Sequence, residues 1–142
     1  SDMMLAYHKR LTSPDEAERL AAARAWSVWE GATSTLIPEP ASIDVFEDPH
    51  FALSFARIEN HYFVNNGFFA VDDQLLRDVP KIRHIPGVIV HGRYDVVCPV
   101  QNAWDLHQAW PEAKLVITPA SGHSAFESEN ASALVEATDA FR

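Results

Sequence analysis

Cysteine is nearly absent from this sequence, since Cys98 is the single one among 142 residues. An internal disulfide framework is therefore excluded, and a lone thiol fits the reducing conditions of a cytoplasm. Long apolar runs are also missing, because no stretch approaches the roughly 20 residues that a membrane-spanning helix needs. The first residues do not show the pattern of a signal peptide. We therefore expect a cytoplasmic location and no membrane partner.

Positive charge is scarce as well, since the sequence has 11 Lys and Arg against 20 Asp and Glu, which gives a formal net charge of −9. Phosphate contacts need a surplus of Lys and Arg, so this balance argues against a nucleic-acid partner. No cysteine or acid cluster lies at the spacing of metal ligands from six of the histidines, which are His8, His50, His61, His84, His91 and His107. We expect these histidines to be structural or exposed, and we predict no metal and no cofactor.

The composition that is present, 47% hydrophobic with four Trp and eight Phe, is that of a folded protein. The first half has the pattern of helices joined by a proline-rich loop. Ser13 can cap the first of these helices, with Pro14 at its first position. The expected elements are a helix from Ser13 to about Trp29, a loop with one short helical turn over 31–50, a helix over 51–63 that Asn65-Asn66-Gly67 ends, and a short helical piece over 75–79.

The pattern changes near Pro80, where β-branched runs begin to alternate with helical segments. The expected order is a strand at Val88–Val90, a helix from Pro99 to Trp110, a strand at Leu115–Ile117 and a helix from Glu127 to Phe141. Strands and helices that alternate with short connections predict right-handed parallel βαβ units. The predicted fold class is therefore α/β, with a helical module followed by the last βαβα part of a doubly wound sheet.

Asp95 and His123 each follow one of these strands, where catalytic groups of open α/β sheets collect. A carboxylate there can orient an imidazole, and the imidazole can take a proton from a serine hydroxyl. Acid before histidine is the chain order of an α/β-hydrolase triad, but the Gly-x-Ser-x-Gly motif of the nucleophile is absent. The alternatives are a turn or helix-cap role for Asp95 and an ordinary surface position for His123.

Several blocks of sequence closely resemble the end of the proline iminopeptidases, which are α/β-hydrolase serine peptidases that remove an N-terminal proline. The blocks are His91-Gly92-Arg93-Tyr94-Asp95-Val96-Val97-Cys98-Pro99, Ala103-Trp104-Asp105-Leu106, Ala120-Ser121-Gly122-His123-Ser124, Ala25-Trp26-Ser27-Val28-Trp29-Glu30 and Ala56-Arg57-Ile58-Glu59-Asn60-His61-Tyr62-Phe63. The resemblance implies a helical cap domain over 1–79 and the C-terminal part of the catalytic domain over 80–142. The family's first half, with its oxyanion segment and its nucleophile, has no counterpart here.

The resemblance also implies roles for single residues. Asp95 would orient the base and His123 would be the base, whereas Glu59 and Glu30 would bind the protonated amine of the substrate. Paired carboxylates offset the desolvation of a buried ammonium, which fits this role. Cys98 would line the proline pocket. Without the family, Glu30 is a solvated residue at a helix end and Cys98 a small buried apolar residue.

The resemblance implies the C-terminal portion of a proline iminopeptidase, inactive alone because its nucleophile is missing. The expected partners are peptides with an N-terminal proline, the missing N-terminal half of the enzyme and a second copy of the chain. Two other interpretations remain: a different α/β-hydrolase, of the esterase or epoxide hydrolase type, or a non-catalytic truncated domain. The carboxylates Glu59 and Glu30 distinguish the peptidase from the other hydrolases, because an ester without an amine gives them nothing to bind.

Overall fold

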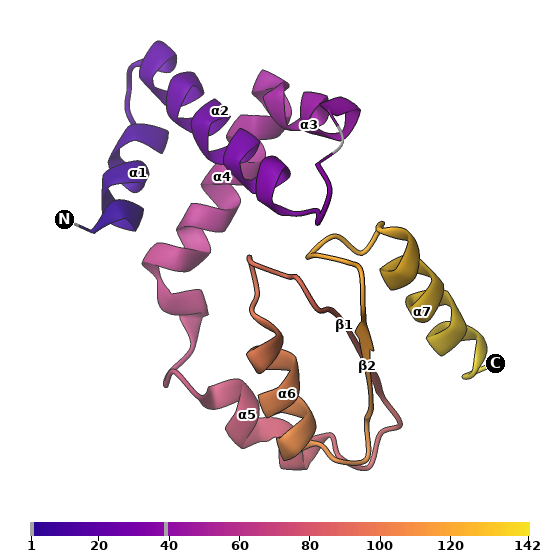
Figure 1. Ribbon diagram of the computed structural model, residues 1–142. Helices are drawn as coiled ribbons and strands as arrows, with labels where there is room; N and C mark the ends of the chain where they lie inside the picture. The colour runs from indigo at the N-terminus through magenta and orange to yellow at the C-terminus, as the bar shows by residue number, and fades with distance from the viewer. Residues whose placement is uncertain (1, 39) are drawn as a thin grey trace. The chain divides into compact units, whose positions relative to one another are not determined.

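The computed structural model describes residues 2–38 and 40–142, which divide into two compact units (Figure 1). The first unit takes in the residues up to Ala32 and those from Pro38 to Asp72. The second unit takes in Thr33–Ile37 and Asp73–Arg142. The second unit is therefore built from two stretches of sequence. The functional division into 1–79 and 80–142 stays a prediction.

The first unit is a group of helices around a small apolar core. Its helices are α1 (Met3–Leu11), α2 (Glu16–Thr33, whose last residue belongs to the second unit), α3 (Pro40–Glu47) and α4 (Pro49–Val64), followed by the 3₁₀ turn η1 (Asn66–Phe68). The buried core consists of Leu11, Ala22, Ala23, Trp26, Ala52 and Ala56. Alanines of α2 and α4 and the indole of Trp26 therefore belong to one buried cluster.

Helix α4 confirms the prediction over 51–63, because local signals set both of its ends. Asp48 accepts a hydrogen bond from the Phe51 N–H at 2.8 Å, and Pro49 lies in the first turn. Asn65 caps the other end, and the chain then turns through three residues of positive φ, Asn66, Gly67 and Phe68. The expected end at Asn65-Asn66-Gly67 is therefore confirmed as well.

The helical half differs from the prediction in helix α1, which was not predicted, and in three further details. Helix α2 begins at Glu16, because Asp15 and not Ser13 accepts the Ala17 N–H, at 2.9 Å. It also continues to Thr33, since nothing between Trp29 and Thr33 breaks it. The segment 31–50, predicted as a loop with one short turn, contains the whole of α3. Proline is tolerated at the first position of a helix, so Pro40 does not prevent one there.

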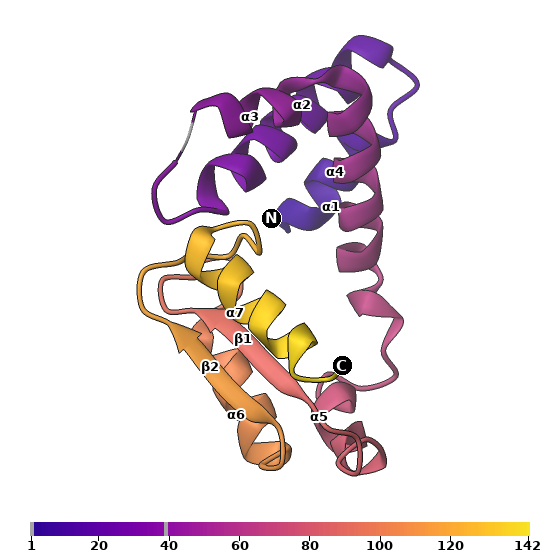
Figure 2. The same cartoon turned by 90° about the vertical axis from the view of Figure 1, so that its right-hand side faces the viewer.

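The second unit holds a two-stranded parallel sheet with a helix on each face (Figures 1 and 2). After α5 (Gln74–Asp78) and the 3₁₀ turn η2 (Val79–Lys81), the order is β1 (Val88–Gly92), α6 (Val100–Ala109), β2 (Lys114–Thr118) and α7 (Ser128–Asp139). Val88 pairs with Lys114 and Gly92 pairs with Thr118, so both strands end together at their carboxyl ends. The expected α/β class, with two parallel strands in the second half of the chain, is confirmed.

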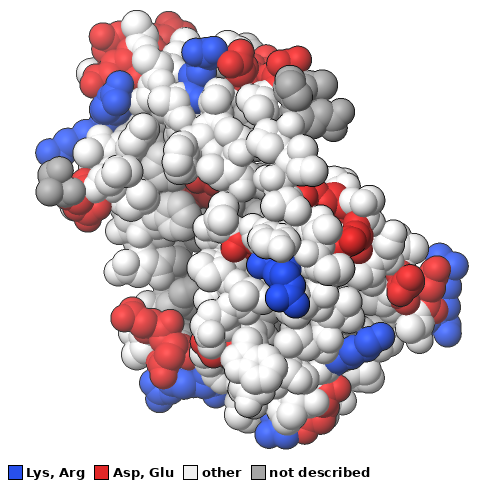
Figure 3. Space-filling model, viewed as in Figure 1, with Lys and Arg blue, Asp and Glu red and all other residues white. Residues whose placement is uncertain are grey.

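None of the helices in the described stretches combines the length and the hydropathy that a membrane crossing requires. On the face that Figure 3 shows, Lys and Arg lie interspersed with Asp and Glu and do not gather into a basic stripe.

Candidate active site

Asp95 lies in the turn that follows β1, and backbone donors hold its carboxylate in place. Its Oδ1 accepts the Val97 N–H at 3.0 Å and the Cys98 N–H at 2.7 Å. The Asp95 side chain is only 4% exposed. A buried carboxylate must be compensated by hydrogen bonds, and these two amides satisfy one oxygen. The other oxygen, Oδ2, is thus available to a partner from another loop.

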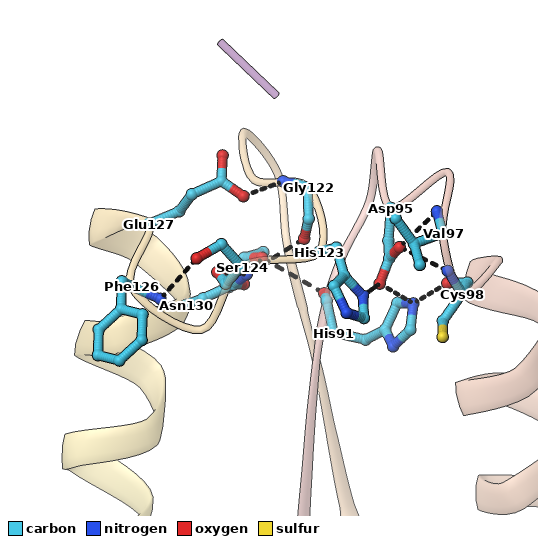
Figure 4. A network of polar contacts seen from close by, with 11 residues as sticks. His91, Asp95, Val97, Cys98, Gly122, His123, Ser124, Phe126, Glu127 and Asn130 are labelled. Atoms are coloured by element: carbon cyan, nitrogen blue, oxygen red, sulfur yellow. Dashed lines mark hydrogen bonds and ion pairs between the residues drawn. The ribbon is translucent and has the colours of Figure 1, made fainter. Parts of the chain in front are cut away.

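That partner is His123, whose Nδ1 lies 2.9 Å from Asp95 Oδ2 (Figure 4). The prediction that these two side chains approach within hydrogen-bond reach is confirmed. Because an ionised carboxylate only accepts, Nδ1 carries the proton and Nε2 is the basic nitrogen of the neutral ring. The His123 side chain is 39% exposed, so its ring is accessible to a reactant. A buried acid behind a partly exposed imidazole is the arrangement of a general base.

His91 is a residue of this site that the sequence analysis placed among the structural or exposed histidines. It lies on β1, and its side chain is largely buried. Its Nε2 donates to the Cys98 carbonyl oxygen at 2.8 Å and lies 3.5 Å from Asp95 Oδ2. His91 therefore braces the loop that presents the acid. The sequence carries no signal of this role, because the bond of His91 goes to a backbone carbonyl and not to a side chain that the sequence identifies.

The turn after β1 and the loop that carries His123 are docked backbone to backbone. Arg93 N–H donates to the Thr118 carbonyl and Tyr94 N–H donates to the Ser121 carbonyl, each at 3.0 Å. A Cβ added at Gly92 would lie only 2.0 Å from the Gly122 carbonyl oxygen. Gly92 is therefore the residue that allows the two loops to approach.

The first turn of α7 holds the same loop from the other side. Asn130 is buried, and its amide donates to the carbonyls of Gly122 at 3.2 Å and Ser124 at 2.9 Å. Its Oδ1 accepts the Thr118 hydroxyl at 2.6 Å. Glu129 accepts the Ala120 N–H at 2.7 Å. Because β2 and α7 both hold the loop, the backbone around His123 has little freedom.

In the first unit, Glu59 is half-buried and accepts the Trp26 indole N–H at 2.6 Å. Glu30, also half-buried, lines a cavity of about 390 Å³ together with Met3, Met4, Tyr7, Ala25, Trp26, Trp29 and Phe63. Trp26 thus contacts Glu59 and shares the cavity wall with Glu30. Glu59 itself is not among the residues that line this cavity. The predicted role of the two acids in substrate binding stays a prediction.

Cys98 contributes to the site through its backbone, because its N–H bonds Asp95 and its carbonyl accepts from His91. Its side chain is exposed, so the alternative of a small buried apolar residue is wrong. The predicted pocket-lining role stays a prediction. Within residues 2–38 and 40–142, no group of three or more His, Cys, Asp or Glu is arranged to hold a metal ion.

Comparison with known proteins gives a family model for the second half of the chain and relatives that cover nearly all of it. Residues 70–141 match the model of an α/β-hydrolase family described as TAP-like protein. A proline iminopeptidase of Xanthomonas citri is 71% identical over 99% of this chain and 45% of its own length. Proteins of the same name from Arabidopsis thaliana and Neisseria gonorrhoeae are 55% and 50% identical, over 98% and 94% of this chain and 37% and 42% of theirs. The chain therefore spans less than half the length of these relatives.

Proposed function

Because this chain belongs to the α/β-hydrolase family described as TAP-like proteins, we propose that it supplies the acid and the base of a proline iminopeptidase. In this proposal it is the carboxyl-terminal portion of a longer enzyme. The nucleophilic serine comes from residues outside this sequence, which contains no Gly-x-Ser-x-Gly motif. The observation that carries the proposal is the 2.9 Å contact between Asp95 Oδ2 and His123 Nδ1.

The reaction would use His123 twice. Its Nε2 takes the proton of the serine hydroxyl as the oxygen attacks the carbonyl carbon of the N-terminal proline. The imidazolium then gives this proton to the leaving amine, and water hydrolyses the acyl-enzyme with the same base. Asp95 holds the tautomer in which Nδ1 is protonated and stabilises the imidazolium. The two backbone donors on Oδ1 keep the carboxylate oriented throughout.

Specificity for an N-terminal proline would come from Glu59 and Glu30. The secondary ammonium of the substrate needs carboxylates once water is removed from it. The bond from Trp26 supports this role for Glu59, because it fixes one carboxylate oxygen and leaves the other for the amine. Cys98, exposed next to the acid, would contact the proline ring. The single cysteine of the chain supports a cytoplasmic location for this activity.

A chimera tests the proposal directly. The remaining part of the Xanthomonas citri relative is fused to this chain and assayed with a prolyl chromogenic amide. We expect turnover by the chimera and none by the 142-residue chain alone. His123→Ala should lower kcat by at least about 10⁴-fold. The matched control is His84→Ala, because His84 is exposed and lies before β1. A folded chimera without activity, or full activity in the His123 variant, would reject the proposal.

The role of Glu59 is tested in the same chimera. Glu59→Gln should raise KM for prolyl substrates and lower kcat/KM by roughly 10- to 1000-fold, because a charged hydrogen bond to the ammonium is lost. Glu16→Gln removes an exposed charge from the start of α2 and serves as the control. Unchanged kinetics in Glu59→Gln would favour the esterase alternative.

A further inference from the structure

The carboxylate of Glu127 joins two parts of the chain that are far apart in sequence. Its Oε1 accepts the Gly122 N–H at 2.7 Å, next to His123 (Figure 4). Its Oε2 accepts the Leu36 N–H at 2.9 Å, across a separation of 91 residues. Among the described residues, no Lys or Arg forms an ion pair with Glu127, so these two amides are what the carboxylate binds. Hydrogen bonds to an ionised acceptor are stronger than neutral ones.

The segment Ser34–Leu36, which we call the strap, also contacts the His123 loop directly. The Ser34 carbonyl oxygen accepts two N–H groups, from His123 at 3.0 Å and from Ser124 at 2.7 Å. The contact is close, because a Cβ at Gly122 would lie 2.9 Å from the Leu36 nitrogen. Two hydrogen bonds therefore join the strap to the loop directly. Glu127 links them further, with one bond to each segment.

We propose that Glu127 is a positioning residue for His123, acting through the strap. This inference rests on the proposed function, in which His123 is the base. The backbone at 122–124 determines the direction of the imidazole, and the strap binds the backbone nitrogens of His123 and Ser124. Glu127, the N-cap of α7, binds both Gly122 and the strap, so its removal leaves only the two Ser34 bonds between the strap and the loop.

Glu127 differs in this respect from the other polar residues that hold the loop. Glu129 and Asn130 bind loop groups that lie within 12 residues of them in sequence. Neither has a hydrogen bond to the strap among the described contacts. A general loosening of the loop can therefore be separated from loss of the strap by comparing variants of Glu127 with variants of Glu129.

The test uses the 142-residue chain and NMR, and it needs no enzymatic activity. Amide hydrogen exchange is followed at Leu36, Gly122, His123 and Ser124, and the imidazole Nδ1–H resonance of His123 reports its bond to Asp95. In Glu127→Gln we expect exchange at His123 and Ser124 to accelerate by about tenfold or more, with a weaker Nδ1–H signal. Glu127→Asp keeps the charge but is too short to reach both amides, so it should behave in the same way.

The controls separate this effect from a change of charge or of fold. Glu136→Gln removes the same charge from an exposed position on α7 and should leave all four amides unchanged. Glu129→Gln should accelerate exchange at Ala120 while His123 and Ser124 stay as in the wild type. Unchanged exchange at His123 and Ser124 in both Glu127 variants would overturn the proposal, as would wild-type behaviour of Glu127→Asp. An inactive chimera combined with the expected exchange pattern would reject the proposed function alone.

Discussion

At the scale of single residues, Gly92 has the least tolerance for a side chain. Its missing Cβ would meet the backbone of Gly122, which cannot rotate away as a side chain could. We expect Gly92→Ala to lower the free energy of unfolding by about 3 kcal/mol or more and to separate His123 from Asp95. Urea unfolding and the His123 Nδ1–H resonance measure the two effects.

Gly87→Ala is the matched comparison for this prediction. Its added Cβ would contact the indole ring of Trp110, a side chain that can move. We expect a smaller loss of stability there and an intact bond between Asp95 and His123. Equal effects of the two substitutions would show that the contact between the loops is not what makes Gly92 special.

The approach of Asp95 and His123 could be predicted because each residue lies in the turn or loop that follows a β-branched run, and parallel strands end at one edge of a sheet. His91 could not be recognised by the same reasoning. A histidine within a strand carries no sign of which loop it touches, and its bond goes to the backbone carbonyl of Cys98. Every residue type has a backbone carbonyl, so the amino-acid type of the partner does not reveal such a hydrogen bond.

At the scale of elements, the start of α7 is held to β2 by Asn130. Its buried side chain bonds the Thr118 hydroxyl and two loop carbonyls. Asn130→Ala removes three hydrogen bonds at once and leaves the Gly122 carbonyl without its amide donor, so we expect a loss of about 2–4 kcal/mol in the free energy of unfolding. Asn102→Ala, at an exposed position on α6, should change it by less than about 0.5 kcal/mol. Thermal and urea unfolding check both values.

A second element-level prediction concerns the segments that lead into the two strands. Arg83 before β1 donates to Glu112 before β2, with Nε 2.8 Å from Oε2. This hydrogen bond lowers the pKa of Glu112 below its ordinary value. A lowered pKa in the folded state gives a stabilisation that is present above the unfolded pKa and is lost as pH falls through the folded pKa.

The difference in urea midpoint between the wild type and Glu112→Gln should therefore shrink as the pH is lowered through the acidic range. Both side chains are exposed, so the difference at neutral pH should be small and should decrease further with added salt. A difference that grows on acidification would contradict this interpretation of the pair.

The elements of the second unit were predicted well because β-branched runs and helical periodicity agree there. The helical half was harder. Prolines at 38, 40 and 49 suggested a loop, yet Pro40 and Pro49 each begin a helix, where a missing N–H costs nothing. Helix α1 was not predicted. Its start depends on Asp2, which accepts the amides of Met4 and Leu5.

At the scale of the whole molecule, the described sheet has only two strands, so each has an outer edge without a strand partner. Strand β1 begins with the apolar run Val88–Val90. Unpaired apolar edges favour pairing with another chain. We therefore expect the isolated chain to self-associate, with a symmetric dimer as the simplest product.

Light scattering over a dilution series measures this association. The apparent mass should fall towards 15.9 kDa, the mass of one chain, as the concentration is lowered. The chimera is the control and should show weaker association, because the proposed function places its added part against this chain. A chain that stays strictly monomeric at high micromolar concentration would contradict the prediction.

The bond between Leu36 and Glu127 also bears on how this protein is made. Closing a loop of 91 residues costs roughly 4 kcal/mol of chain entropy, so this contact is expected to form late in folding. At about 5–20 residues per second on the ribosome, the strap waits roughly 5–18 seconds for its partner to be synthesised. Substitutions at Glu127 should therefore speed unfolding and leave the folding rate almost unchanged.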